Sequence, residues 1–330
     1  MKQEHVEKLF QWIDDTATVI SEDMNITYLE AIAETMDVLF NGQPFDDMKE
    51  SLQTHLTNEL LKVNKDDFEK EEVRKAVQLT ILKGMKGATQ QQHLITPDSV
   101  AMFMGYLASK LFEDQEDLKL FDPASGSGNL ITSVMNQLEM PVQAYASEVD
   151  PTLIQLAVTN ANLQQNKIEF FHQDSLAPFL MEPVDFVLAD LPVGYYPDDA
   201  QAERYQLKAE EGLSYAHHLF IEQGLNYTKA GGYLMFIVPN FLFDSDQSKA
   251  LNAFLREHAH IVGMLQLSDS LFKDEKHGKS ILILQKKGET TKAPKQALLA
   301  KLPSFKNPNG MADILAQINQ WFDEYKMAKL

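Results

Sequence analysis

The sequence contains no cysteine. Without thiols, the chain can form no disulfide framework, no thiolate nucleophile and no zinc–thiolate site. Long apolar runs are also missing: the best candidate, Tyr233–Phe243, is interrupted by Pro239 and Asn240 and is far shorter than the roughly 20 residues that span a bilayer. The N-terminal stretch is charged and amphipathic, unlike a signal peptide. These absences predict a cytoplasmic protein that does not enter the membrane.

Basic residues are scarce, since 29 lysines and arginines stand against 48 acids and give a net charge of −19. Residues 93–269 hold 24 acids and 8 bases, whereas residues 270–306 hold 9 lysines and 3 acids. An acidic body repels the phosphate backbone, which disfavours tight unaided binding to duplex DNA. The lysine-rich segment favours nucleic acid by its charge, but a solvated loop face is the preferred interpretation.

The first 92 residues show only helical patterns. Apolar residues recur at helical spacing in three stretches, Val6–Ile13, Leu29–Phe40 and Asp67–Lys83. We therefore predict an N-terminal helical domain over residues 1–92, with Lys83–Gly87 as a glycine-containing linker.

From residue 93 to residue 330, short apolar runs alternate with helical segments. Seven runs are predicted strands: Lys119–Asp122, Gln143–Glu148, Ile168–His172, Val184–Asp190, Tyr233–Val238, Ile261–Leu267 and Ser280–Gln285. Helices are predicted over residues 128–137, 151–164, 215–228 and, at the C-terminus, 307–330. Such alternation indicates an α/β fold with a mostly parallel, Rossmann-like sheet covered on both faces. The short connection between the last two runs indicates an antiparallel final strand.

The sharpest local signal is the segment Phe121–Asn129, which reads FDPASGSGN between a predicted strand and a predicted helix. Doubly wound sheets bind nucleotides at such a place, and Gly126 and Gly128 permit a tight turn close to a ligand. Asp122 would repel the pyrophosphate of a dinucleotide but would attract the sulfonium and ammonium groups of S-adenosylmethionine. The chain also lacks the G-x-G-x-x-G and G-x-x-x-x-G-K-[ST] patterns. Charge therefore favours S-adenosylmethionine over NAD or ATP.

Two further acids end the next predicted strands. Glu148 is placed to accept hydrogen bonds from ribose hydroxyls, and Asp174 to accept one from the adenine amine of the cofactor. Either acid alone would be interpreted as a solvated turn residue. Together with Asp122, however, they place an acid at the end of each of three successive strands, and this arrangement favours a binding site.

These motifs resemble those of the N6-adenine DNA methylases, particularly the modification subunits of type I restriction systems. Asp122–Gly128 resembles the DPACGSG motif, with Ser125 in place of cysteine. Leu94–Pro97, before a predicted helix over Val100–Leu111, resembles the TP motif, whose threonine region contacts the methionine end of the cofactor. The resemblance extends over residues 93–285 through Gly231–Tyr233 and Val238–Asn240, and it implies a class I methyltransferase.

The catalytic motif departs from the family pattern. Asn/Asp-Pro-Pro-Tyr/Phe is replaced by Asp190-Leu191-Pro192-Val193. The resemblance implies that the Asp190 side chain and the Leu191 carbonyl accept both hydrogens of an exocyclic amine. Leucine in place of proline adds an N–H and loosens the turn. Val193 removes the aromatic surface on which a flipped base stacks, so Tyr195 or Tyr196 either substitutes for it or only packs the loop.

The resemblance implies two sets of site residues. The catalytic set is Asp190, Leu191, Pro192, Tyr195 and Tyr196. The cofactor-binding set is Thr96, Asp122, Pro123, Ala124, Ser125, Gly126, Gly128, Asn129, Glu148, Val149, Asp174, Ser175 and Asp190. No metal site is predicted, because the adjacent His217 and His218 do not share one helix face and are interpreted as one packed and one exposed side chain.

The favoured function is methyl transfer to adenine N6 in DNA, with RNA or a protein amide nitrogen as alternative acceptors. No second domain is large enough to read a DNA sequence, so recognition is expected to need a separate partner; an oligomer is compatible with the sequence. A second hypothesis, motivated by Leu191 and Val193, is a cofactor-binding regulatory protein that has lost catalysis. A nicotinamide dehydrogenase is the weakest alternative.

Overall fold

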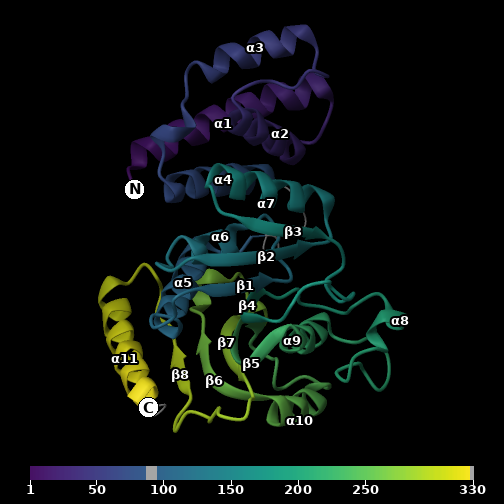
Figure 1. Ribbon diagram of the computed structural model, residues 1–330, viewed down its shortest axis with the longest axis vertical. Coiled ribbons are helices and arrows are strands. Elements are labelled where there is room, and N and C mark those ends of the chain that lie inside the picture. The colour runs from purple at the N-terminus through teal and green to yellow at the C-terminus, as the bar shows by residue number, and fades with distance from the viewer. Residues whose placement is uncertain (87–94, 328–330) are drawn as a thin grey trace. The chain divides into compact units, whose positions relative to one another are not determined.

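The computed structural model describes residues 1–86 and 95–327 (Figure 1). The predicted boundary after Gln92, Gly87 of the linker and Leu94 of the TP motif lie outside the described residues. The described chain divides into two compact units, and the division at residue 92 remains a prediction. The first unit comprises Met1–Tyr106, Ser125–Glu139 and Ala144–Gln173, and the second comprises Leu107–Ala124, Met140–Gln143 and Asp174–Leu330.

The fold is α/β, with an eight-stranded and mostly parallel sheet in the order β3-β2-β1-β4-β5-β7-β6-β8. The strands are β1 (Leu118–Asp122), β2 (Val142–Glu148), β3 (Ile168–His172), β4 (Val184–Asp190), β5 (Thr228–Pro239), β6 (Ala259–Gln266), β7 (Lys279–Lys286) and β8 (Leu298–Lys301). β7 runs antiparallel to both β5 and β6, as the short connection before it predicted.

The eighth strand corrects the prediction of seven. β8 lies inside the lysine-rich segment, where a solvated loop was expected, and it pairs in parallel with β6. Only Leu298 of its four residues is buried, while Leu299 is exposed. So short an edge strand leaves no alternation long enough to recognise in the sequence.

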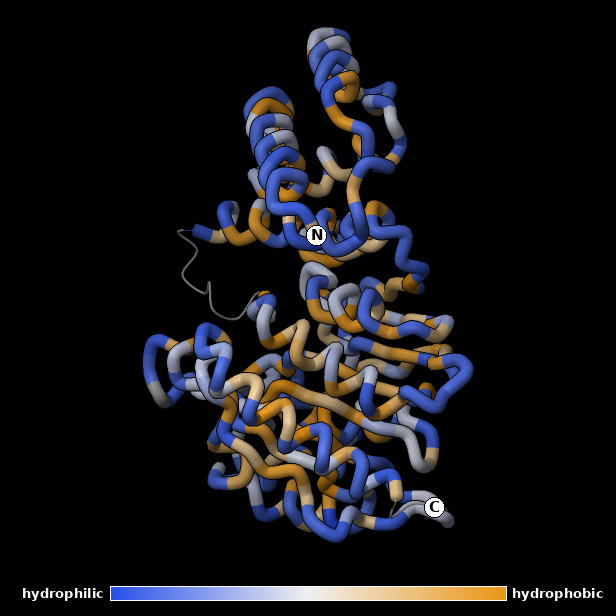
Figure 2. The backbone as a smooth tube through the Cα atoms, turned by 90° about the vertical axis from the view of Figure 1, so that its left-hand side faces the viewer, coloured by the Kyte–Doolittle hydropathy of each residue, from blue (hydrophilic) through white to orange (hydrophobic). Residues whose placement is uncertain are grey.

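The first unit contains the N-terminal helices together with β2 and β3. The helices are α1 (Gln3–Met24), α2 (Tyr28–Asn41), α3 (Glu50–Leu60) and α4 (Lys70–Gly84), followed by α5 (Asp98–Leu111), α6 (Asn129–Met135) and α7 (Pro151–Leu163). Residues 107–111 of α5 and residues 142 and 143 of β2 belong to the second unit. The apolar faces of α1 and α2 share one core with Leu156 and Leu163 of α7. Figure 2 shows hydrophobic and hydrophilic residues intermixed along the helices near the N-terminus. α2 begins at a capping box of Thr27 and Glu30 and ends at Gly42, where φ is 70°. The predicted helical character of residues 1–86 is confirmed.

The second unit contains β1 and β4 to β8 with α8 (Asp199–Ala202), α9 (Ala216–Asn226), α10 (Ser248–His258) and α11 (Pro308–Met327). β4, and β5 from Tyr233 to Pro239, are nearly continuous runs of buried residues, typical of strands covered on both faces. At Gly232, a Cβ atom would lie 2.8 Å from the Asp185 carbonyl oxygen, so only glycine permits this approach of β5 to β4. No helix in the described ranges is long and apolar enough to cross a bilayer.

Candidate functional site

The glycine turn belongs to the first unit. Gly126 and Gly128 have φ angles of 53° and 76°, in the left-handed region that favours glycine. A Cβ atom on Gly128 would also lie 3.2 Å from the Cβ of Ala157 on α7. The Ser125 N–H donates to the Ser147 carbonyl at 3.0 Å, and the Asn160 side chain donates to the Ser127 carbonyl at 3.3 Å. The turn is therefore fixed against β2 and α7.

Glu148, at the end of β2, contacts this turn directly. Its Oε2 accepts the Gly126 N–H at 2.9 Å, while its Oε1 accepts the N–H groups of Val149 at 2.9 Å and Asp150 at 3.0 Å. Backbone donors that converge on a carboxylate fix its orientation. The Val149 side chain is exposed. Thus the predicted acid, the predicted turn and Val149 lie together.

Thr96 and Asn129 also lie together in the first unit. Asn129 is buried at the first position of α6, and its Nδ2 donates to the Thr96 carbonyl at 3.0 Å. Its Oδ1 accepts from Nη1 of Arg74 at 2.9 Å. Arg74 was not anticipated by the sequence analysis, because it lies on α4, 55 residues before Asn129.

The second unit holds the other predicted cofactor residues at its strand ends. Asp122 is buried, and its Oδ1 accepts the Ala124 N–H at 3.0 Å. The Ser175 hydroxyl donates to the Pro123 carbonyl at 2.5 Å. Within this unit, the segment after β1 is thereby tied to the segment after β3.

Asp174 binds two groups of the second unit. Its Oδ1 accepts the Leu176 N–H at 2.9 Å, and its Oδ2 accepts the Tyr196 hydroxyl at 2.5 Å. Burial and this contact with Asp174 raise the pKa of Tyr196, so the phenol remains a hydrogen-bond donor. The carboxylate is held in one orientation by these two donors.

Asp190 ends β4 and forms an ion pair that was not predicted. Nζ of Lys279, the first residue of β7, lies 2.6 Å from Oδ1 of Asp190, and the two side chains are only 12% and 21% exposed. The two residues are 89 positions apart in the sequence. They meet across the sheet, in which only β5 lies between β4 and β7. The Asp190 carboxylate is therefore held by a cation that comes from β7, two strands away in the sheet.

Leu191 does not loosen the turn as expected from its replacement of proline. Its N–H donates to the Ile237 carbonyl at 3.1 Å, so the added donor extends the ladder between β4 and β5 by one bond. The side chain is buried, at 1% exposure. Leucine is therefore accommodated by a backbone hydrogen bond that proline could not form.

The two tyrosines after the motif have different environments. Tyr196 is buried and bound to Asp174, so it packs the loop. Tyr195 is 56% exposed, and its ring stacks on Tyr215 with centroids 4.9 Å apart and an interplanar angle of 11°. Of these two residues, only Tyr195 presents an exposed aromatic ring.

The interpretation of His217 and His218 as one packed and one exposed residue is wrong, since both are fully buried. The reason is that α9 is buried on every side from Ala216 to Leu225. Burial lowers the pKa of His217 to about 3 and that of His218 to about 4. No group of metal-ligating side chains occurs within residues 1–86 and 95–327.

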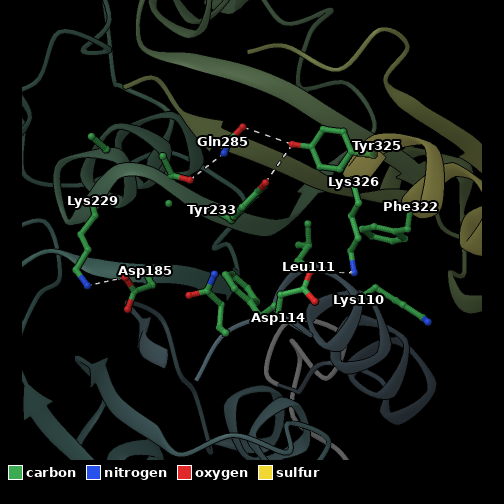
Figure 3. Close-up of a pocket in the computed structure, with 15 residues that line it drawn as sticks. Lys110, Leu111, Asp114, Asp185, Lys229, Tyr233, Gln285, Phe322, Tyr325 and Lys326 are labelled. Atoms are coloured by element: carbon green, nitrogen blue, oxygen red, sulfur yellow. Dashed lines mark hydrogen bonds and ion pairs between the residues drawn. The ribbon is translucent and has the colours of Figure 1, made fainter. Parts of the chain in front are cut away.

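The second unit contains a cavity of about 400 Å³, and none of the predicted catalytic or cofactor-binding residues lines it. It is lined by Asp185 and Lys229, near the starts of β4 and β5, whereas Asp190 ends β4. Figure 3 shows the ion pair of Lys229 with Asp185 on one side, and Tyr233, Tyr325 and Gln285 joined by hydrogen bonds on the other. This cavity is at the opposite end of β4 from the segment Asp190-Leu191-Pro192-Val193.

The strand order, the antiparallel β7, the glycine turn and the strand-end carboxylates define a class I S-adenosylmethionine-dependent methyltransferase. The chain belongs to the N-6 DNA methylase family, whose model matches residues 83–325. A second model, the YtxK N-terminal helical domain, matches residues 7–85. The cofactor of this protein is S-adenosylmethionine, as charge and resemblance predicted.

Two similar proteins cover nearly the whole chain. The uncharacterized protein YtxK of Bacillus subtilis (strain 168) is 46% identical, over 99% of this chain and 100% of its own length. A crystal structure from Listeria monocytogenes, provisionally named a class I S-adenosylmethionine-dependent methyltransferase, is 43% identical. It superposes with a TM-score of 0.91 over 97% of this chain and 100% of that protein.

A more distant structure supports the fold alone. The type I restriction-modification methyltransferase subunit from Streptococcus thermophilus is 16% identical, with a TM-score of 0.64 over 96% of this chain and 74% of that subunit. The predicted α/β methyltransferase fold and the suspected family are thus both confirmed.

Proposed function

We propose that this protein transfers the methyl group of S-adenosylmethionine to the exocyclic amine of adenine in DNA. The observation that carries the proposal is the geometry at the end of β4. There, the Asp190 carboxylate is partly buried and fixed by Lys279, and the backbone at Leu191 is fixed by its bond to Ile237. A fixed carboxylate followed by a backbone carbonyl can accept the two hydrogens of a planar amine.

The residues around the glycine turn and the strand ends fit the cofactor. Asp122 and Glu148 are carboxylates oriented by backbone donors, which suits a ligand that carries sulfonium and ammonium groups. We assign Glu148 to the ribose hydroxyls, Asp174 with Ser175 to the adenine ring, and Thr96 with Asn129 to the methionine end. When bound, S-adenosylmethionine supplies the electrophilic methyl group.

The acceptor is oriented by the chain's own groups. Asp190 and the Leu191 carbonyl each accept one amine hydrogen, which leaves the nitrogen lone pair directed toward the methyl carbon. Tyr195 provides the exposed ring on which the base stacks, in place of the aromatic residue missing at Val193. On receiving the methyl group, with S-adenosylhomocysteine as the leaving group, the amine nitrogen would carry a positive charge and would then release one proton to water. The negative charge of Asp190 stabilises the developing positive charge.

DNA is the favoured acceptor because of the family, although the acidic body disfavours unaided binding to a duplex. The similar Streptococcus protein is a subunit of a larger system. We therefore propose that a separate partner recognises the DNA sequence, and that the protein acts in the cytoplasm. RNA and protein amide nitrogens are the alternative acceptors.

The proposal is tested by supplying labelled S-adenosylmethionine with short single-stranded DNA, with RNA and with protein. Single strands avoid the need for a partner that opens the duplex. We expect label on the N6 atom of adenine. The Tyr195→Ala variant should be about tenfold slower because a stacking ring is lost, and Tyr195→Phe, which keeps the ring, is its control. Cofactor binding without transfer to any of the three acceptors would contradict the proposal.

A second candidate function, a cofactor-binding regulatory protein without catalysis, is favoured by two observations. Val193 lacks an aromatic ring, and Lys279 already occupies Oδ1 of Asp190. If the native protein is active, Val193→Tyr should raise the transfer rate by up to about tenfold through added stacking. An inactive native protein whose Leu191→Pro/Val193→Tyr variant becomes active would instead establish the regulatory alternative. The same labelled assay distinguishes these outcomes.

A further inference from the structure

We propose that Arg74, on helix α4, is a positioning residue for the methionine end of the cofactor site. The inference rests on the proposed roles of Thr96 and Asn129. Neither Thr96 nor Asn129 belongs to the N-terminal helices, which were expected to form a separate domain. Arg74 does belong to the N-terminal helices, so these helices would take part in cofactor binding.

Arg74 is a buried cation with three polar partners. Its side chain is 1% exposed, and Nη1 lies 2.7 Å from Oδ1 of Asp98 and donates to Oδ1 of Asn129 at 2.9 Å. Nε and Nη2 donate to the Glu71 carboxylate at distances between 2.8 and 3.0 Å. A buried guanidinium is stable only when its donors are paired in this manner. Removing it would leave Asp98 and Asn129 without that shared partner.

The partners of Arg74 flank two segments assigned to the cofactor. Asp98 begins α5 two residues after Thr96, and Asn129 directly follows Gly128 of the glycine turn. One guanidinium therefore contacts a residue beside each segment. Within the first unit, it holds the TP segment and the turn in a fixed relation.

The chemistry of arginine also sets the orientation of Asn129. A guanidinium carries only donors, so it binds the Oδ1 end of the amide. The Nδ2 end then faces the Thr96 carbonyl, to which it donates at 3.0 Å. Without Arg74, the amide could rotate and present an oxygen to that carbonyl, which would repel it. The position of Thr96 thus depends on a residue of α4.

A matched control lies on the same helix. Glu72 is also 1% exposed, but it binds the Lys2 N–H at 2.6 Å and His5 at 2.9 Å, both near the N-terminus. Replacing Glu72 disturbs a buried charge of α4 without touching Asp98 or Asn129. It therefore separates a loss of helix stability from a loss of positioning.

The test compares three ligands by calorimetry: S-adenosylmethionine, S-adenosylhomocysteine and 5′-methylthioadenosine, which lacks the amino-acid end. Arg74→Met should weaken the binding of S-adenosylmethionine and of S-adenosylhomocysteine by about tenfold, the cost of one charge-assisted hydrogen bond. The affinity for 5′-methylthioadenosine should change by less than about twofold. Arg74→Lys retains the charge but not the planar fork, so it should recover part of the loss. Glu72→Gln should lower the melting temperature and leave the ratios of the three affinities unchanged.

Asn129→Ala provides an independent variant if Arg74→Met does not fold. It removes the amide that Arg74 binds together with the contact assigned to Asn129 itself, so a selective loss of affinity is expected from this variant alone. The double variant is decisive: if Arg74 acts through Asn129, adding Arg74→Lys to Asn129→Ala should cause no further loss of affinity. Equal weakening of all three ligands, or no weakening, in the Arg74→Lys and Asn129→Ala variants would overturn the inference and leave the proposed function intact. A native protein that binds none of the three ligands would overturn the proposed function itself.

Discussion

Replacing Asp190 with alanine is expected to slow methyl transfer by about a hundredfold or more, the usual effect of losing one preorganised polar contact in an active site. The variant loses the acceptor that orients the amine. It also leaves the Lys279 ammonium, 2.6 Å from Oδ1 in the native protein, without the carboxylate that neutralises it. That cation would oppose the positive charge that develops on the attacking nitrogen. Single-turnover rates with labelled cofactor measure the effect apart from ligand affinity.

Charge and geometry can be separated with two further variants. Asp190→Asn retains a carbonyl acceptor but not the charge that compensates Lys279, so it should lose activity by a smaller factor than the alanine variant. Adding Lys279→Met removes the uncompensated cation and should recover part of that loss. Full transfer activity in Asp190→Ala would show that the acceptor is not held at the end of β4.

Acidification is expected to destabilise the protein strongly through His217 and His218. Both are fully buried, and burial lowers their pKa values to about 3 and about 4, whereas in the unfolded chain they titrate near 6.5. Below pH 6.5 the unfolded state binds protons that the folded state does not. The stability that depends on the neutral rings is therefore complete above about pH 6.5 and is lost as the pH falls toward 4. Below pH 6.5, each histidine lowers the free energy of unfolding by roughly 1.4 kcal/mol per pH unit. At pH 5 the pair has therefore lowered it by roughly 4 kcal/mol.

Urea unfolding at pH 7.5, 6.5 and 5.0 measures this loss. A His217→Phe/His218→Phe variant retains aromatic rings for the contacts with Tyr215 and Phe241, and it should lose much less stability between pH 6.5 and 5. His277→Phe is the control for replacing a histidine with an apolar ring, because His277 is exposed. Equal pH dependence in the native protein and the double variant would contradict this account.

The parts of the fold that depend on local pattern could be predicted from the sequence. β3 and β4 have the predicted bounds, because each is an apolar run with a clear end. The contact of Glu148 with the glycine turn follows from the rule that parallel strands end at one edge of a sheet. β8 was missed because four residues at a sheet edge carry too little pattern.

What the sequence could not provide were contacts made across the fold. Arg74 and Lys279 meet their partners at separations of 55 and 89 residues, and neither belongs to a recognisable motif. The burial of His217 and His218 is decided by what packs around α9, and the helix's own periodicity does not show it. Tyr195 and Tyr196 are adjacent and chemically identical, so only the loop conformation distinguishes the exposed ring from the buried one.

The central claim, that carboxylates beside a glycine bend bind a cationic nucleoside, is tested most directly by calorimetric titration with S-adenosylmethionine and with NAD. We predict binding of S-adenosylmethionine at one site and no binding of NAD. Asp122→Asn and Glu148→Ala should each weaken the affinity by about 1–3 kcal/mol, the cost of losing a hydrogen bond or charge contact to the ligand. Binding of NAD alone, or unchanged affinity in both variants, would contradict the claim.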